Sequence, residues 1–446
     1  MPPSTTTVSQ PQLRRVLRLR DLIFYGIIII QPTAPMPVFG VVSQAARGHV
    51  VTAVLVAMVA MLFTAISYGR MARAYPTAGS AYSYVSCELH PGLGYLTGWS
   101  ITMDYLLNPL ICTIWCAKAA ANFPVLAHVP YAALAVFFAL LFTLLNLRGI
   151  ETSARINQWM GITLGVVVLI FFVYAVRYVM GQDHSAAALL LPFYNPATFS
   201  LPALSTGSAI AVLTYIGFDS VSTLSEEAEN PRRNILLATV LTCLITGVLA
   251  SLEVYLGQLV WPDFQHYPDV DTAFVHIGMR AGGVFLFGLM NLALVVATIG
   301  SGFGSQLAAA RLLYGMGREN AIPRKFFGVL EPKRSIPRNN VIFSGVVALA
   351  GALVLSYDLG AELLNYGAFI AFMGVNASAF VHDCLRERKW NWTDWAPPIM
   401  GFVVCFYIWL NLSMPAKKFG SAWLILGALY GLSRGAFRRN APVVPS

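Results

Sequence analysis

Charged residues are scarce in this sequence, and the motifs that mark enzymes and metal sites are missing. Only 11% of the 446 residues are charged, whereas 57% are hydrophobic. The six cysteines show no CxxC or Cys/His ligand spacing, so no metal site or disulfide framework is predicted. Neither HExxH nor GxSxG occurs, which argues against an enzyme, and no pore-filter motif suggests a channel. We expect neither a cofactor nor an obligate protein partner.

Long apolar runs recur from residue 22 to residue 436. A hydrocarbon core of about 30 Å requires roughly 20 helical residues to cross it. By that measure the sequence predicts an all-α polytopic membrane protein with 12 transmembrane helices, embedded in a lipid bilayer. The predicted spans are 22–46, 50–69, 94–121, 128–147, 156–179, 203–226, 234–260, 283–306, 339–357, 361–384, 396–414 and 420–436.

The basic residues test this count, because cytoplasmic loops carry an excess of Lys and Arg. With twelve spans and both termini in the cytoplasm, nearly all of the 29 basic residues fall on the cytoplasmic side. This asymmetry also explains the net charge of +9, so nucleic acid is not an expected partner. The exceptions are Arg47, Lys118, Arg177, Arg280, Lys417 and Lys418.

The span pattern predicts one membrane domain with short tails. We interpret the polar N-terminal tail as retained and cytoplasmic, and we expect the chain in the cell membrane. The predicted division is a cytoplasmic tail at 1–20, a single transmembrane domain at 21–436 and a cytoplasmic tail at 437–446. Within the transmembrane domain we predict repeats at 22–180 and 203–385 and two extra helices at 396–436.

Two of the predicted spans are interrupted. Pro32, Pro35 and Pro37 lie inside the first span, although a proline in a helix interior costs about 3 kcal/mol. The next comparable interruption lies five spans later, where 209–227 loses its apolar character from Gly217 onward. A single proline favours a packed kink, but irregular backbone at two matched positions favours a cavity that binds a solute. An odd-numbered repeat runs in opposite senses, which predicts a 5+5 inverted repeat with a site at both breaks.

Four segments resemble the amino acid–polyamine–organocation (APC) superfamily of permeases. The strongest is YIGFDSVSTLSEEAENPRRNI (215–235), which is similar to the family's span-6 signature. AAARLLYGMGRENAIPRKF (308–326) is similar to its span-8 signature, and 68–85 and 94–109 also resemble it. Membership implies the fold of sodium-coupled neurotransmitter-type (LeuT-type) symporters, with ten core helices plus two, and transport by alternating access.

The sequence departs from this family at two places. Amino-acid members carry a Gly-rich first break, whereas this chain has QPTAPMP. Many proton-coupled members carry a lysine near the position of Leu164, but 156–179 contains no lysine. The family's usual argument for proton coupling therefore does not transfer to this chain.

Two acidic residues lie at membrane depth, where a carboxylate costs roughly 2.5–3.5 kcal/mol. Asp104 begins a polar stripe in the third span and is interpreted either as a proton or cation site or as a cap for a broken helix. By resemblance Asp219 lies beside the substrate, or else it only ties the second break to its neighbours. The candidate substrate-binding residues are Thr33, Ala34, Pro35, Met36, Pro37, Asp104, Tyr105, Tyr215, Gly217, Phe218 and Asp219.

Other polar residues have structural interpretations. Thr298, Ser301 and Ser305 offer oxygens for sodium, although packing of a Gly/Ser-rich helix is the preferred interpretation. Arg311 is expected to anchor a loop. The acidic run after the second break predicts a solvated ion-pair cluster at the cytoplasmic end, made of Glu226, Glu227, Glu229, Arg232 and Arg233.

Together these features predict a secondary active transporter that imports an amino acid or a polyamine such as putrescine, coupled to H⁺ or Na⁺. An obligate exchanger is the alternative. The prolines leave only Thr33, Ala34 and Met36 as amide donors for a carboxylate, whereas Asp104 and Asp219 offer negative charge to an ammonium group. Both facts favour a polyamine, but amides elsewhere can hold a carboxylate. Amino acid, polyamine and another organocation therefore all remain open.

Overall fold

The computed structural model describes residues 13, 15–121, 126, 128–148, 150–182, 186–268, 270 and 272–433. The tail predicted at 437–446 and most of the tail at 1–20 lie outside them. A helix is found at each of the twelve predicted segments, which confirms the all-α fold class. The helices are α1 (Leu19–Ile30), α2 (Pro35–Ala45), α3 (Val50–Ala74), α4 (Ser80–Glu88), α5 (Pro91–Ala121), α6 (Tyr131–Asn146), α7 (Ile150–Met180), α8 (Ala186–Leu190), α9 (Leu201–Ala211), α10 (Pro231–Val260), α11 (Ala273–Arg318), α12 (Arg324–Phe327), α13 (Arg338–Val354), α14 (Tyr357–Phe380), α15 (Trp392–Leu410) and α16 (Met414–Ser433).

Three further helical pieces have other geometries. Two are the 3₁₀ helices η1 (Val212–Tyr215) and η2 (Phe218–Leu224), which continue α9. The third is a π-helix, η3 (Val381–Arg386), at the end of α14. Within the described residues β-type pairing is limited to two isolated bridges, Leu17 with Ala228 and Glu331 with Ile336.

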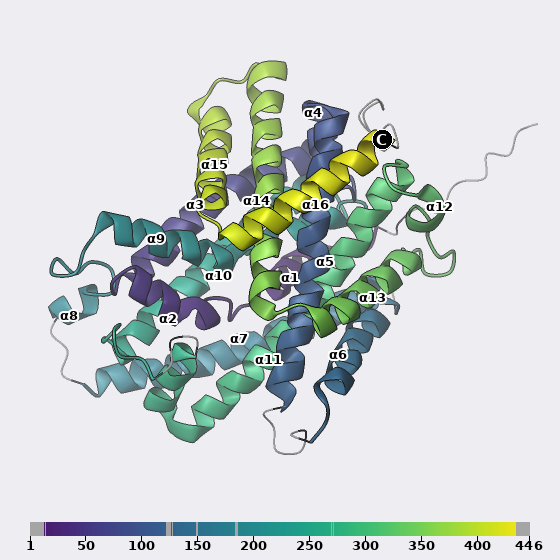
Figure 1. Ribbon diagram of the computed structural model, residues 1–446. Helices are drawn as coiled ribbons and strands as arrows, with labels where there is room; N and C mark the ends of the chain where they lie inside the picture. The colour runs from purple at the N-terminus through teal and green to yellow at the C-terminus, as the bar shows by residue number, and fades with distance from the viewer. Residues whose placement is uncertain are drawn as a thin grey trace, which may run out of the picture.

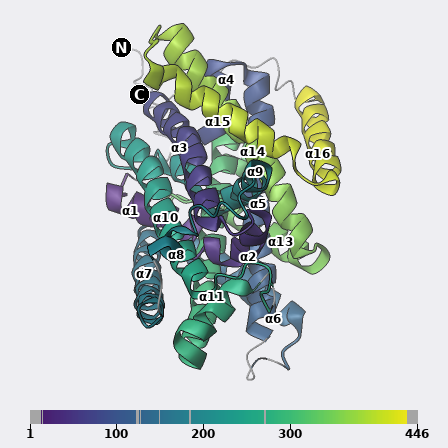
Figure 2. The same ribbon diagram turned by 90° about the vertical axis from the view of Figure 1, so that its left-hand side faces the viewer.

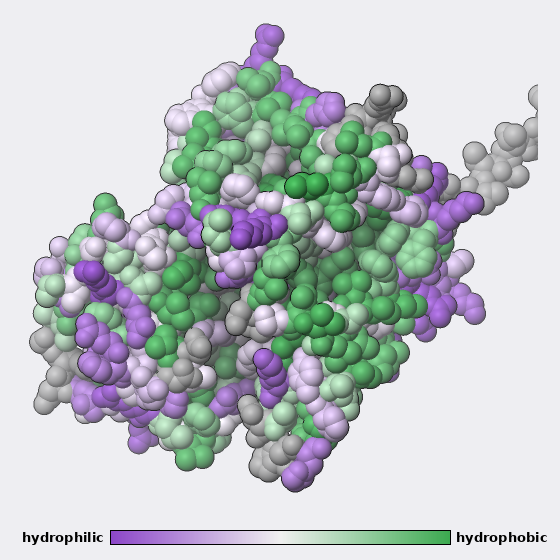
Figure 3. Space-filling model, in the orientation of Figure 1, coloured by the Kyte–Doolittle hydropathy of each residue, from purple (hydrophilic) through white to green (hydrophobic). Residues whose placement is uncertain are grey.

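Length and composition qualify seven of these helices as membrane spans, or eight when the bent pair α1 and α2 counts as one. The α6 and α13 helices are apolar but shorter. The exposed surface of the helices is also hydrophobic: large apolar side chains such as Trp159 and Val346 are more than 60% exposed. Figure 3 shows apolar residues over much of one face, with hydrophilic residues mostly toward its edges. Such a surface suits contact with lipid.

The long helix α5 runs through the middle of the bundle beside α14, and α16 crosses their outer side (Figure 1). Figure 2 shows α16 at one edge of the molecule. Two tryptophans fasten it there. The indole nitrogen of Trp99 donates to the carbonyl of Trp423 at 2.9 Å, the reverse bond measures 3.0 Å, and the rings stack at 4.8 Å. The last helix is therefore bound directly to the core.

The helix α11 is longer than the span predicted at 283–306 because it contains a kink. Gly282 and Gly283 leave helical geometry, and Gly283 adopts a φ of 63°, which favours glycine. The predicted span begins at this kink. The assignment of 22–180 and 203–385 as two repeats stays a prediction.

Candidate functional site

The first span is broken between α1 and α2, whose axes differ by 54°. Prolines cause the break, because they supply no amide hydrogen for a continuous helix. The amide of Ala34 donates to the Gln31 carbonyl at 3.1 Å, and that of Met36 to the Thr33 carbonyl at 3.0 Å. Within the described backbone this leaves the Thr33 amide as the one donor of the break without a backbone acceptor. The start of α2 therefore offers little to a carboxylate.

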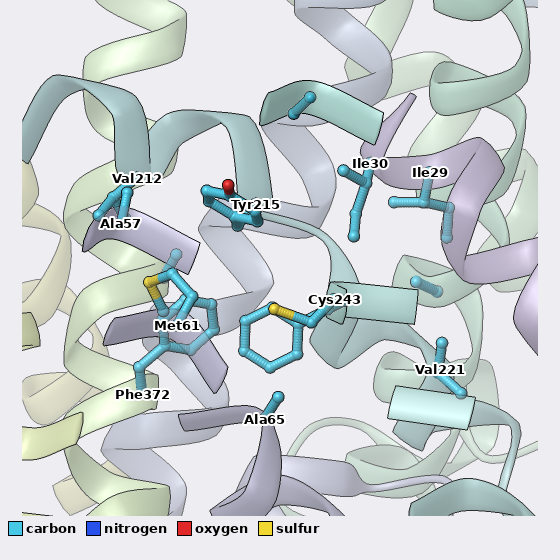
Figure 4. Close-up of a cluster of buried hydrophobic side chains, with 14 of the residues drawn as sticks. Ile29, Ile30, Ala57, Met61, Ala65, Val212, Tyr215, Val221, Cys243 and Phe372 are labelled. Carbon is cyan, nitrogen blue, oxygen red and sulfur yellow. The ribbon is translucent and has the colours of Figure 1, made fainter. Parts of the chain in front are cut away.

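The second span is broken at Gly217, between η1 and η2. Gly217 has a φ of 117°, which side chains rarely permit. A Cβ atom at this position would also lie 2.7 Å from Cγ2 of Ile29, at the end of α1. The two breaks are thus in direct contact, as the five-span spacing predicts. Figure 4 shows the apolar cluster around them, with Ile29 and Ile30 on α1 and Tyr215 on η1.

A cavity of about 200 Å³ opens beside the first break. Its walls come from both broken spans and from α5, α11 and α14. Among the described lining residues none is Asp, Glu, Lys, Arg or His, so the cavity is neutral. The apolar lining is Ile29, Ile30, Ala34, Pro37, Val38, Ile111, Trp115, Leu213, Ile216, Leu294 and Leu364, and the polar lining is Gln31, Asn108, Cys112, Thr298, Ser301 and Asn365.

Hydrogen bonds join polar groups of the residues that line this cavity. The Ser301 hydroxyl donates to the Ile29 carbonyl at 2.7 Å, and the Cys112 thiol donates to the amide oxygen of Asn108 at 3.3 Å. Ile29 lies in the last turn of α1, where the helix dipole is negative. Carbonyl oxygens at a helix C-terminus stabilise a cation, so this wall suits an ammonium group.

The predicted acidic residues lie in a buried layer next to the cavity. Asp219 is fully buried and Asp104 is 2% exposed, and neither lines the cavity. The Tyr105 hydroxyl donates to Oδ2 of Asp219 at 2.5 Å, while Oδ1 has no partner among the described residues. On α5, Asn108 reaches the cavity one helical turn beyond Asp104.

The structure divides the candidate residues into two groups. Ala34 and Pro37 line the cavity, as expected of a binding site. The other predicted residues are packed in the protein: the Tyr215 hydroxyl donates to the Val54 carbonyl at 2.9 Å, and Phe218 packs between aromatic rings. The remaining members of this packed group are Thr33, Pro35, Met36, Asp104, Tyr105, Gly217 and Asp219.

Several cavity residues were not among the candidates. Asn365 is a polar residue within the apolar run 361–384, and that signal alone could have marked it. Gln31 directly precedes the prolines. Thr298 and Ser301 were interpreted as packing residues, yet both line the cavity. Their inclusion depends on which side of α11 faces the break, which the sequence pattern does not specify.

Two ion pairs lie toward the C-terminal end of α11, away from the cavity, and one of them is fully buried while the other is partly exposed. The Arg311 guanidinium contacts both oxygens of Glu227 at 2.5 and 2.7 Å, and these side chains are 0% and 1% exposed. Arg318 binds Glu226 in the same two-point manner. Arg311 lies ten residues beyond Ser301 on α11, which is about 15 Å along the helix. The cavity is therefore sealed on this side.

These pairs correct two predictions. The acidic residues were expected to form a solvated cluster with Arg232 and Arg233, but Glu227 is buried and its partner is Arg311. Arg311 was expected to anchor a loop and instead pairs inside the bundle. The amides of Val16 and Leu17 also donate to the Glu227 carbonyl, each at 2.9 Å. The segment before α1 is thus part of the closure.

Comparison with known proteins agrees with this architecture. The sequence profile of a family described as amino acid permease matches residues 22–431. The chain is 33% identical to the low-affinity putrescine importer PlaP of Escherichia coli (strain K12), over 96% of this chain and 95% of that protein. It is 25% identical to the branched-chain amino acid permease BcaP of Lactococcus lactis, over 96% of each, and 25% identical to the methylthioribose transporter of Bacillus subtilis, over 94% and 92%.

Replacing Gly217 by alanine tests the contact between the breaks. We expect Gly217→Ala to lower stability by about 1–3 kcal/mol, because alanine is strained at this φ and its Cβ collides with Ile29. Gly288→Ala is the control, because nothing lies within 4 Å of its Cβ position. Thermal unfolding of both variants in detergent measures the difference, and equal melting temperatures would contradict the packing described.

Removing the charge of Glu227 tests whether its buried ion pair with Arg311 holds this end of the bundle closed. Glu227→Gln leaves the Arg311 charge buried and unpaired, so we expect a loss of about 3–5 kcal/mol. The exposed pair of Glu387 and Lys389, at 3.8 Å, is the control, and Glu387→Gln is expected to have little effect. Unfolding of the purified variants is the measurement. Similar losses in both variants would show that Arg311 is not held by Glu227.

Proposed function

Because the chain belongs to the amino acid permease family, within the amino acid–polyamine–organocation superfamily, we propose that it imports a small aliphatic amine, with putrescine as the first candidate. The observation that supports this substrate is that most backbone amides of the first break already donate hydrogen bonds within the protein. The amides of Ala34 and Met36 are already bonded within the protein, so a substrate carboxylate finds few donors there.

The surroundings of the cavity support a cationic substrate. Asn108, Asn365 and the C-terminal end of α1 line it, and Asp104, one helical turn from Asn108, and Asp219, two residues beyond Gly217, are buried. Charges act more strongly in the low dielectric of a protein interior than in water. One ammonium group of a diamine would meet this negative field, and the apolar wall would contact its carbon chain.

The transport cycle proposed for this chain is alternating access. In the conformation described, the ion pairs of Glu226 and Glu227 close one end, which we assign to the cytoplasmic side with both chain termini, and the cavity faces the other. We propose that the protein resides in the cell membrane and that import is driven by H⁺ or Na⁺. An obligate exchanger is distinguished in proteoliposomes, because its uptake requires a counter-substrate inside and ignores an imposed ion gradient.

An aliphatic amino acid is the second candidate. The branched isoleucine and leucine side chains of the cavity, among them Ile111 and Leu364, suit a branched hydrocarbon group. The relative BcaP is a branched-chain amino acid permease. The carboxylate of an amino acid substrate would have to bind the side-chain amides of Gln31 or Asn365 in place of the helix backbone.

Radiolabelled uptake in transport-deficient cells decides between the two substrates. We expect saturable putrescine uptake that leucine does not inhibit, because among the described backbone donors the first break offers a carboxylate only the Thr33 amide. Cells with the empty vector are the control. Saturable leucine uptake without competition by putrescine would overturn the amine assignment and support the second candidate.

A pair of variants tests the role of the Asp219 charge. Asp219→Asn is expected to weaken putrescine binding about tenfold or more, because the variant removes a negative charge buried beside the cavity. Tyr105→Phe removes the hydroxyl bond and keeps the charge, so its affinity for putrescine should stay close to the wild type. Apparent affinities from uptake kinetics provide the measurement. Equal effects of both variants would assign Asp219 a structural role through Tyr105.

A further inference from the structure

Glu253 lies outside both the cavity and the ion pairs of Glu226 and Glu227. Glu253 is on α10, is 0% exposed, and neither of its carboxylate oxygens has a hydrogen-bond partner among the described residues. Glu227 differs in this respect because it is paired with Arg311, and Asp219 differs because it accepts a bond from Tyr105. An ionised carboxylate in this setting costs several kcal/mol, so Glu253 is stable there only in its neutral form.

We propose that Glu253 is a proton-binding site that couples import to the proton gradient. Its identity as a coupling site rests on the proposed function, whereas its protonation rests on burial and missing partners alone. When water reaches the residue from outside, the carboxylate takes up one proton and becomes a carboxylic acid. It holds that proton while buried and releases it to water on the opposite side. No other bond forms or breaks.

The position of Glu253 is fixed by its neighbours on α10. One turn further along, the Cβ position of Gly257 lies 3.0 Å from Phe274 on α11 and 3.3 Å from Phe39 on α2. The Gln258 side chain donates to the Gly48 carbonyl, just before α3. Glu253 therefore lies in the half of the bundle where α2, α3 and α11 begin.

No cationic group neutralises Glu253 in that half. The elements packed on α10 are α1, α2, α3, α7, α11, η1 and η2, and α2 carries no titratable residue. None of the described groups on the others makes a hydrogen bond or ion pair with Glu253. On these elements and just before α3, the titratable residues toward this half of the bundle are Tyr25 on α1, His49 before α3, Tyr174 and Tyr178 on α7, His276 and Arg280 on α11, Tyr215 on η1 and Asp219 on η2.

Three of the groups that could donate are bound elsewhere. Arg280 donates to the Tyr178 hydroxyl at 2.8 Å and lies over the Trp261 ring. The Nδ1 atom of His49 is 2.9 Å from the Ala46 carbonyl, and its Nε2 accepts from a backbone amide at 3.0 Å. The Tyr25 hydroxyl donates to the Gly304 carbonyl. The charge state of Glu253 is therefore controlled by access to water.

The same face of α10 links Glu253 to the breaks. Thr242, Thr246 and Glu253 follow helical spacing, and both threonine hydroxyls also lack partners among the described residues. Oγ1 of Thr242 lies 2.6 Å from the Cβ position of Gly26 on α1, beside Val221 of η2. Because α10 contacts α1, α2, η1 and η2, a rearrangement of either broken span changes the surroundings of Glu253.

Proteoliposomes with the membrane potential clamped at zero test the coupling. For one proton per substrate, an inward gradient of one pH unit drives up to about tenfold accumulation of radiolabelled putrescine. We expect the wild type to show it and Glu253→Gln to show none, because glutamine mimics the protonated acid permanently. Counterflow of putrescine, which needs no net proton movement, is expected to persist in Glu253→Gln and in Glu253→Met.

Two controls separate this proposal from the proposed function. Glu387→Gln, at an exposed site, is expected to keep gradient-driven accumulation. Infrared spectroscopy of the substrate-free protein is expected to show the carbonyl band of a protonated carboxylic acid, and Glu253→Gln to reduce it. Accumulation that persists in Glu253→Gln, or an unchanged band, would overturn the role of Glu253. Absence of putrescine counterflow in the wild type would overturn the substrate instead, and the infrared result would still decide the protonation.

Discussion

The rest of this structure depends on the requirement that backbone polar groups at membrane depth be satisfied inside the protein. Two of the predicted spans violate helical continuity, and each is tolerated because the other is packed against it. Gly217 lets η2 approach the end of α1, and Ser301 on α11 binds the Ile29 carbonyl that the break exposes. The cavity lies where these two contacts leave the C-terminal end of α1 accessible.

The charged side chains of this bundle occupy distinct places relative to the cavity. The cavity wall is neutral, Asp104 and Asp219 lie buried beside it, and paired charges such as Arg311 and Glu227 close one end. Buried charge is costly, so each carboxylate needs a partner, a proton or a cationic ligand. Glu227 has its partner, and Asp219 keeps one unpartnered oxygen near the site. Under our proposals a cationic substrate balances the carboxylates beside the cavity, and a proton neutralises Glu253.

The absence of a span-5 lysine has a consequence for coupling. The 156–179 segment offers no titratable amine, so a proton-coupled cycle needs another group. Under our proposal Glu253 supplies that group from α10, a helix that contacts both broken spans. The coupling site is then separate from the substrate cavity, because Glu253 does not line it.

The sequence by itself determined the spans, because hydrophobic length is a local property that the bilayer sets. It also determined both breaks, since Pro32, Pro35, Pro37 and Gly217 act on their own backbone. Only the tertiary structure decided which residues face the cavity. Asn108 reaches it although Asp104, one turn away, does not, and Glu227 pairs with Arg311 across 84 positions of the chain. Those outcomes depend on how helices rotate and pack against one another, which no local pattern encodes.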